Sequence, residues 1–386
     1  MHRVIIIVMD GCGVGAMPDA GAYGAAGPQS ATLPHVAEAV GGLHLPTLQR
    51  LGLGNIATIR GVTPTEAVGG WGRMAEASAG KDSVTGHWEL MGIVTEKPFP
   101  TYPRGFPAKG IAAFERAIGR GTLGNMAGSG TELLKRFGME HMATGRPIVY
   151  TSADSVFQLA AHEAVVPVAS LYAMCATARR LLKGKHNVQR VIARPFVGDT
   201  PQNFRRTENR RDFVLRPPTP NFLTTLQAAG RTAQAIGVIA DLFPRPYFAR
   251  ADRTQSNPAH LAAILAAVQT GQEDLVFANC EDFDMLYGHR NDPVGFARSL
   301  EDFDVASDRI VGSLRSEDLL IITADHGNDP TTASTDHSRE YVPLLVFGEQ
   351  YGVQGDLGTR ATFADVAATA AEWLDIPWTG PGRSLL

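Results

Sequence analysis

The chain has 386 residues, of which 44% are hydrophobic and 19% are charged, as in an ordinary soluble globular protein. This length predicts two domains, or one large domain that carries an insertion. The formal net charge of −4 argues against a nucleic-acid-binding surface. The three cysteines show no CxxC spacing, so the sequence gives no sign of a disulfide framework or a cysteine-type zinc site.

The apolar run at 4–9 is too short for a membrane span, which needs roughly 20 apolar residues. It ends at Asp10 and lacks a small-residue cleavage site after it, which argues against a signal peptide. We therefore expect a cytoplasmic protein without nucleic-acid or membrane partners.

The first predicted element is a central strand at 4–9, because its residues are β-branched and apolar throughout. A glycine-rich turn, Asp10-Gly11-Cys12-Gly13-Val14-Gly15, follows directly. A dinucleotide-binding fingerprint is an alternative for this turn, although its spacing differs and the Asp10 carboxylate would repel a pyrophosphate.

The segment 79–91 mixes several side-chain chemistries within a few positions, among them Lys81, Asp82, Ser83, Thr85 and His87. No simple amphipathic period explains this mixture. It indicates a functional site, although a polar loop before a helix would have a similar composition.

Prolines interrupt the chain at 98–107 and again at 217–220, and such stretches commonly mark crossings between domains. We predict a smaller α+β cap domain at 102–216, inserted into a core domain made of 1–101 and 217–386. After the insertion, helix-like segments separate predicted strands at 232–239, 275–279, 319–323 and 342–347, and a helix is predicted at 362–374. This alternation predicts an α/β fold with a mostly parallel sheet and helices on both faces.

Candidate metal ligands follow three of the predicted strands. They are Asp10 after 4–9, Asp284 and His289 after 275–279, and Asp325, His326 and His337 after 319–323. The carboxyl ends of parallel strands meet at one edge of a sheet, so these side chains should converge. A single Asp-His pair could equally belong to a turn with surface histidines. Three aspartates and three histidines together suffice for two divalent ions, the arrangement that promotes phosphoryl transfer. Ser83, after Lys81-Asp82, would supply a nucleophilic hydroxyl.

At these positions the sequence resembles the phosphopentomutase family of the alkaline phosphatase superfamily. The resemblance rests on Met9-Asp10-Gly11, Gly80-Lys81-Asp82-Ser83, Asp282-Phe283-Asp284, Gly288-His289-Arg290, Asp325-His326-Gly327-Asn328-Asp329 and Asp336-His337-Ser338-Arg339-Glu340-Tyr341. It runs nearly from end to end and includes cap segments such as 150–156 and 191–198, which distinguish this family from the rest of the superfamily.

The resemblance implies two manganese ions, one bound by Asp284, His289 and His337 and the other by Asp10, Asp325 and His326. It implies that Ser83 is the phosphorylated nucleophile, with Thr85 as an alternative. The family usually has threonine in place of Ser83 and lysine in place of Val238. Serine supplies the same oxygen, whereas the effect of the valine stays open.

The implied reaction interconverts ribose 1-phosphate and ribose 5-phosphate, with the 2-deoxy sugars also accepted, through phospho-Ser83 and a pentose 1,5-bisphosphate. A sugar bisphosphate such as glucose 1,6-bisphosphate would prime the enzyme. Asp154, Arg190 and Arg194 of the cap would bind the pentose and its distal phosphate, or would form ordinary salt bridges.

Two other functions are alternatives to the mutase: a two-metal phosphomonoesterase and a non-catalytic metal-binding protein. A large cap favours the mutase, because water must be kept from the phosphoenzyme.

Overall fold

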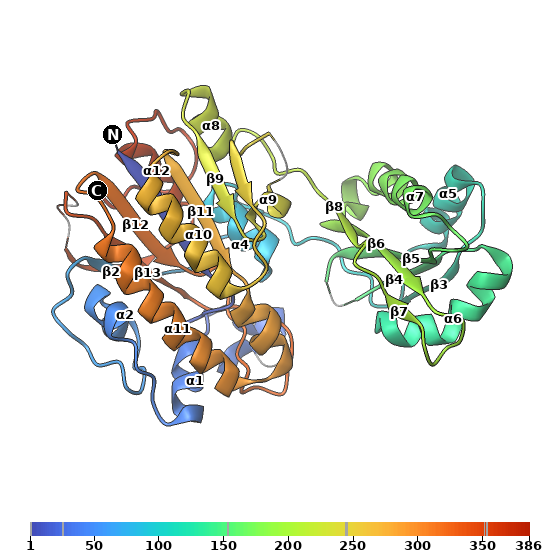
Figure 1. The fold of residues 1–386 in the computed structure, drawn as a ribbon, viewed down its shortest axis with the longest axis horizontal. Helices are drawn as coiled ribbons and strands as arrows, with labels where there is room; N and C mark the ends of the chain where they lie inside the picture. The colour runs from blue at the N-terminus through green and yellow to red at the C-terminus, as the bar shows by residue number, and fades with distance from the viewer. Residues whose placement is uncertain (1, 25–26, 153, 244–245, 351, 353) are drawn as a thin grey trace. The chain divides into compact units, whose positions relative to one another are not determined.

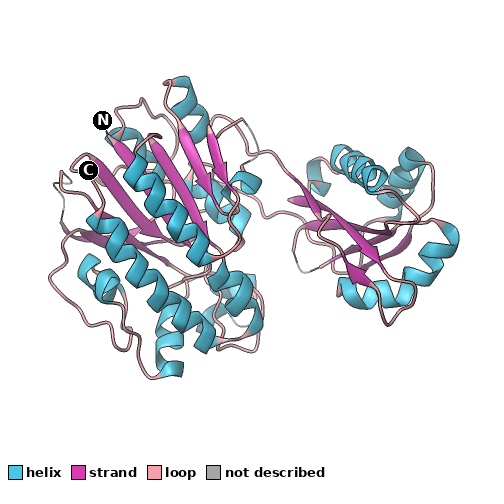
Figure 2. Cartoon of the chain, in the orientation of Figure 1, coloured by secondary structure: helices cyan, strands magenta, loops and turns pink. Residues whose placement is uncertain are grey.

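The computed structural model describes residues 2–24, 27–152, 154–243, 246–350, 352 and 354–386. The chain divides into two compact units, a larger one of Met1–Pro98 with Pro217–Leu386 and a smaller one of Phe99–Arg216. The sequence-based boundaries lie at 101/102 and 216/217. Each unit combines a sheet with helices (Figures 1 and 2). Within the described ranges, no helix is long and apolar enough to cross a membrane.

The larger unit is built on an eight-stranded sheet of order β10-β9-β11-β1-β12-β13-β2-β14. Its strands are β1 (Arg3–Met9), β2 (Gly70–Met74), β9 (Ala233–Ile236), β10 (Arg250–Asp252), β11 (Leu275–Cys280), β12 (Asp318–Thr323), β13 (Val342–Phe347) and β14 (Gly355–Arg360). β13 runs antiparallel to β12 and to β2, whereas the other pairings found among the described residues are parallel. The mostly parallel sheet expected from the sequence is therefore confirmed.

Helices cover both faces of this sheet, as predicted. The helices of the unit are α1 (Thr32–Val40), α2 (Pro46–Leu51), α3 (Leu53–Ile56), α4 (Ser83–Leu90), α8 (Phe222–Ala228), α9 (Ile239–Leu242), α10 (Asn257–Thr270), α11 (Pro293–Gly312) and α12 (Asp365–Trp373). α10 and α11 lie over the face nearer the viewer in Figure 1. α12 packs against β1 and contacts α4 and α8 in the other layer.

The two central strands have the burial that their sequences predict. Every residue of β1 and of β12 is buried, because helices cover both faces of these apolar runs. Truncating one such side chain, for example Ile6 to alanine, would cost about 2–5 kcal/mol. The core therefore holds the ends of these strands in fixed positions.

The smaller unit is a mixed sheet with helices on both faces. Its strands are β3 (Leu123–Ala127), β4 (Ile148–Thr151), β5 (Val156–His162), β6 (Arg190–Val197), β7 (Arg205–Arg206) and β8 (Arg211–Val214), and its helices are α5 (Ala108–Ile118), α6 (Gly130–Thr144) and α7 (Val168–Leu181). α5 and α7 share one apolar cluster with the sheet, whereas α6 belongs to a second cluster.

Candidate metal centre and nucleophile

The candidate ligands lie where three neighbouring strands end. β1 pairs with β11 through Met9 and Cys280, and with β12 through Val8 and Thr323. The chain segments that carry the candidate aspartates therefore leave the same edge of the sheet, as expected for parallel strands. The segment after β11 is a short π-helix, Phe283–Tyr287, a form that is frequent at functional sites.

One group of candidate ligands consists of Asp10, Asp325 and His326, all buried, with ligand atoms within 4.8 Å of one another. Nε2 of His326 lies 3.4 Å from Oδ1 of Asp10 and 3.2 Å from Oδ2 of Asp325. These two carboxylate oxygens are buried, and Oδ1 of Asp10 has no hydrogen-bond partner among the described residues. Buried oxygens of this kind are costly unless a cation compensates them.

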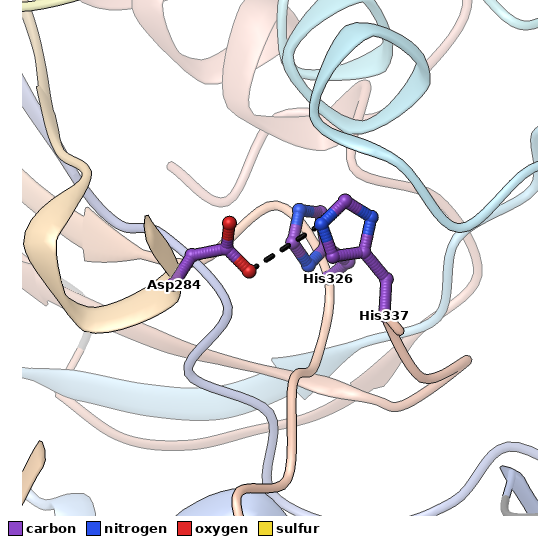
Figure 3. A group of neighbouring side chains, drawn as sticks. All are labelled: Asp284, His326 and His337. Atoms are coloured by element: carbon purple, nitrogen blue, oxygen red, sulfur yellow. Dashed lines mark ion pairs between the residues drawn. The ribbon is translucent and has the colours of Figure 1, made fainter. Parts of the chain in front are cut away.

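A second group consists of Asp284, His326 and His337, again with ligand atoms within 4.8 Å (Figure 3). Oδ1 of Asp284 lies 3.4 Å from Nε2 of His337, the ion pair that is dashed in the figure. Nε2 of His289 lies 3.1 Å from Oδ2 of Asp284 and 3.1 Å from Nε2 of His337. The structure thus brings all six candidate ligands together. His326 belongs to both groups, and the division of the six between two ions stays a prediction.

Two of the three histidines are oriented as metal ligands usually are. Nδ1 of His289 is 2.6 Å from the Thr335 carbonyl oxygen, and Nδ1 of His326 is 3.1 Å from that of Gly327. A carbonyl oxygen can only accept, so Nδ1 of each of these two rings donates to it, and Nε2 is the nitrogen that faces the carboxylates. Metal-bound histidines typically hold their other nitrogen in this way.

The charges of the site also fit a divalent cation. Burial raises the pKa of Asp10 well above its ordinary value, and the nearby charges of Asp325 and Asp284 raise this pKa further. Burial acts in the same direction on Asp284, but the charge of His337 and hydrogen bonds from His289 and His337 hold the pKa of Asp284 well below its usual range. Carboxylate oxygens with imidazole nitrogens suit manganese, zinc or related ions.

Ser83 is the first residue of α4, and its side chain points to the metal centre. Its Oγ lies 3.1 Å from Nε2 of His326. Asp82 caps the helix by accepting from the backbone amides of Val84 and Thr85. A helix N-terminus favours negative charge, which suits a phosphorylated side chain at this position.

The packing of α4 depends on Gly86, which lies against the metal centre. A Cβ atom at Gly86 would come within 2.2 Å of the carbonyl oxygen of Asp325. The hydroxyl of Thr85, the alternative nucleophile, is buried and donates to the Asp82 carbonyl at 2.9 Å. The geometry of the site therefore favours Ser83.

Two fully buried residues, His87 and Asn279, connect this serine to the candidate ligands. His87 lies in the segment 79–91, which the sequence indicates as a functional site, but neither residue could be assigned a role from the sequence. Nδ1 of His87 lies 2.7 Å from the Ser83 carbonyl oxygen and 3.2 Å from Oδ2 of Asp325. Nε2 of His87 lies 3.2 Å from Oδ1 of Asn279, whose Nδ2 donates to Asp10 at 2.6 Å. Burial opposes a charge on His87, but the Asp325 carboxylate and the hydrogen bonds raise its pKa. Asn279 is the next-to-last residue of β11. Its position near the end of a predicted strand is the only feature of the sequence that could have indicated a role in the site.

Two basic side chains join the loop before Ser83 to the segment that carries His337. Nζ of Lys81 donates to Oδ2 of Asp336 at 2.7 Å and to the His337 carbonyl at 2.6 Å. Arg339 is buried, pairs with Glu76 at 2.8 Å, and donates to the carbonyl oxygens of Ser78 and Gly80. These bonds fix the position of the loop before Ser83 relative to a candidate ligand.

The predicted substrate residues belong to the smaller unit, where Arg190 and Arg194 lie on the same face of β6. Nη2 of Arg190 lies 3.5 Å from Oδ2 of Asp154, and Nε of Arg194 donates to Gln158 at 3.1 Å. Burial, together with the charges of Arg210 and Arg206, lowers the pKa of Arg194 to about 10. Substrate binding by these residues stays a prediction. Val238 is half-buried at the start of α9, and nothing in the structure explains its presence.

Comparison with known proteins identifies the family. The sequence profile of the Metalloenzyme superfamily matches residues 2–377. The phosphopentomutase of Caldanaerobacter subterraneus subsp. tengcongensis is 52% identical over 387 positions, which cover 100% of this chain and 98% of that protein. The phosphopentomutase of Herpetosiphon aurantiacus is 51% identical, with the same coverage. The chain belongs to the phosphopentomutase family.

Solved structures of more distant proteins share the fold. A phosphoglycerate mutase of Leishmania mexicana matches with a TM-score of 0.50 and 15% identity, and covers 99% of this chain and 97% of its own. The PH0037 protein of Pyrococcus horikoshii matches with a TM-score of 0.50 and 16% identity, and covers 99% of both chains. This chain therefore shares its fold with these two proteins, and as a member of the phosphopentomutase family it is a metal-dependent phosphomutase.

Proposed function

We propose that the protein interconverts ribose 1-phosphate and ribose 5-phosphate, and the corresponding 2-deoxy sugars. The observation that carries the proposal is the 3.1 Å approach of the Ser83 hydroxyl to Nε2 of His326, inside a group of six candidate ligands. Full-length similarity to phosphopentomutases supports the same substrate class.

Two divalent ions, most simply manganese, would be held by the two sets Asp10–Asp325–His326 and Asp284–His289–His337. When bound, such ions lower the pKa of a nearby hydroxyl and neutralise charge on a phosphoryl group. Two observations support this assignment: Oδ1 of Asp10 is buried without a hydrogen bond in the described part of the chain, and the Nε2 atoms of His289 and His326 face the carboxylates.

The proposed reaction keeps a phosphoryl group on the enzyme between turnovers. Phospho-Ser83 transfers its group to the 5-hydroxyl of ribose 1-phosphate, so the Oγ–P bond breaks, the proton of that hydroxyl passes to Oγ, and ribose 1,5-bisphosphate forms. The bisphosphate reorients, and Oγ of Ser83 then attacks the 1-phosphoryl group. The bond between that phosphorus and the C1 oxygen breaks, and this oxygen takes the proton. Ribose 5-phosphate leaves, and no phosphate is released to water.

The remaining residues of the chain would position and shield these groups. The N-terminus of α4 would stabilise the charge of phospho-Ser83. We propose that Asp154, Arg190 and Arg194 bind the pentose and the phosphate that is not reacting, since guanidinium groups match phosphate oxygens in pairs. A sugar bisphosphate such as glucose 1,6-bisphosphate would prime Ser83. A cytoplasmic location, without nucleic-acid or membrane partners, belongs to the same proposal.

Product analysis tests this function. The protein is incubated with manganese, glucose 1,6-bisphosphate and ribose 1-phosphate, and ribose 5-phosphate and free phosphate are both followed. Ribose 5-phosphate with little free phosphate is the expected result. Stoichiometric free phosphate without ribose 5-phosphate would identify a phosphomonoesterase instead. Intact-mass and peptide analysis should locate one added phosphoryl group on the peptide that carries Ser83.

A further inference from the structure

His87 lies on α4, one turn after Ser83, and is completely buried. Three oxygen atoms surround its imidazole ring. The Ser83 carbonyl and Oδ2 of Asp325 are 2.7 and 3.2 Å from Nδ1, and Oδ1 of Asn279 is 3.2 Å from Nε2. The ring thus stands between the nucleophile and a candidate metal ligand.

The hydrogen-bonding roles around this ring follow from its partners. A backbone carbonyl can only accept, so Nδ1 of His87 donates to Ser83. Asn279 uses its amide nitrogen to donate to Asp10 at 2.6 Å, which leaves the amide oxygen of Asn279 to face His87. Nε2 of His87 therefore donates as well.

A continuous connection results from these bonds. On one side, His87 holds the carbonyl of the nucleophile's own residue and lies beside Asp325. On the other side, it holds Asn279, which in turn fixes the carboxylate of Asp10. The two aspartates that face Nε2 of His326 are thereby tied to the helix that carries Ser83.

We propose that His87 is a positioning residue, which holds the Ser83 hydroxyl in register with the ligands Asp325 and, through Asn279, Asp10. The inference rests on the proposed roles of Ser83 and of these aspartates. Residues that orient metal ligands typically change metal affinity or activity by about 10–100-fold when they are replaced. His87 would act on kcat and on metal affinity rather than on the affinity for the sugar.

Two substitutions separate the two sides of the ring. An asparagine amide nitrogen occupies roughly the place of histidine Nδ1, and a glutamine amide nitrogen that of Nε2. His87→Asn should keep the hydrogen bond to the Ser83 carbonyl and lose the one to Asn279. His87→Gln should keep the hydrogen bond to Asn279 and lose the one to Ser83. His87→Leu removes both bonds and should lower kcat by about 10–100-fold, with KM for ribose 1-phosphate little changed. The kcat of each amide variant should lie between that of His87→Leu and that of the unmodified protein.

Manganese titration by calorimetry supplies a readout that a merely structural role would not change. His87→Leu should weaken manganese binding by about tenfold or more. His141→Leu is a matched control, because His141 is equally buried but lies in α6 of the smaller unit. It should lower the midpoint of thermal unfolding and leave manganese affinity unchanged.

The outcomes are distinguishable. Wild-type protein that produces no ribose 5-phosphate would refute the proposed function itself. If the wild type is active and folded His87→Leu keeps its kcat and manganese affinity within twofold, the positioning role is wrong. That conclusion would hold even if His87→Leu unfolds at a lower temperature, since this loss alone indicates packing.

Discussion

Oγ of Ser83 lies 3.1 Å from Nε2 of His326, the nitrogen that also faces Asp10 and Asp325. A nucleophilic oxygen at this point would lie next to any ion bound between the two aspartates. Ser83→Ala should therefore lower mutase turnover by about 10⁴-fold or more and prevent phosphorylation of this peptide. Ser83→Thr keeps the hydroxyl, so it should keep both mutase turnover and phosphorylation of the peptide. The measurements are ribose 5-phosphate formation and peptide mass after priming. Normal turnover by Ser83→Ala would exclude Ser83 as the nucleophile.

The buried carboxylates of the candidate centre predict a strong link between metal binding and stability. Without a cation, Asp10, Asp284 and Asp325 repel one another, which agrees with the raised pKa of Asp10. Manganese at 100 times its dissociation constant should stabilise the folded state by about 2.7 kcal/mol for each site. Thermal unfolding with chelator and then with added manganese measures this effect, and calorimetry should give two ions per chain. Asp325→Asn should weaken the response. An unfolding midpoint that does not respond to manganese would contradict the site.

Replacement of Arg339 should cause a large loss of stability, whether or not metal is present. Its guanidinium is buried and lies 2.8 Å from Oε2 of Glu76. Arg339→Met would leave the buried carboxyl of Glu76 without its counter-charge, at a cost of about 3–5 kcal/mol in urea unfolding. The double variant Arg339→Met/Glu76→Gln should recover part of this loss.

An exposed ion pair supplies the control for that experiment. Arg50 and Asp308 lie 3.0 Å apart, and both side chains are exposed. Arg50→Met should cost no more than about 1 kcal/mol. Equal losses for Arg50→Met and Arg339→Met would show that burial of the Arg339–Glu76 pair has no energetic effect.

The parts of the fold that depend on local pattern could be predicted from the sequence. β1, β11, β12 and β13 coincide with predicted strands to within a residue or two, because short runs of mainly apolar residues are typical of strands buried on both faces. The strand predicted at 232–239 is shorter, since β9 ends at Ile236 and α9 begins at Ile239. Gly237, with a φ of 72°, turns the chain between the two elements.

The rest of the site depends on distant contacts, which a sequence pattern does not contain. That the six candidate ligands lie close together could be predicted, because each follows a recognisable strand. Asn279 and His87 could not be assigned roles, since their bonds connect residues separated by 192 and 269 positions. Arg339 likewise owes its role to Glu76, 263 positions away.

His141 predicts a pH dependence of stability that arises in the smaller unit. Nδ1 of His141 lies 2.7 Å from the Arg146 carbonyl, and its Nε2 accepts from the backbone amide of His162 at 2.8 Å. Burial lowers the pKa of this imidazole below 6.5, because protonation of Nε2 would break the second bond and bury a charge. A lowered folded-state pKa gives stability that is complete above the unfolded-state value and is lost as pH falls. The free energy of unfolding should therefore decrease below about pH 6.5.

His141→Leu should reduce this decrease in the free energy of unfolding, whereas His44→Leu, at an exposed histidine, should preserve it. Urea unfolding at pH 7.5 and 5.5 measures all three proteins. Identical pH dependence in the wild type and His141→Leu would show that another group is responsible.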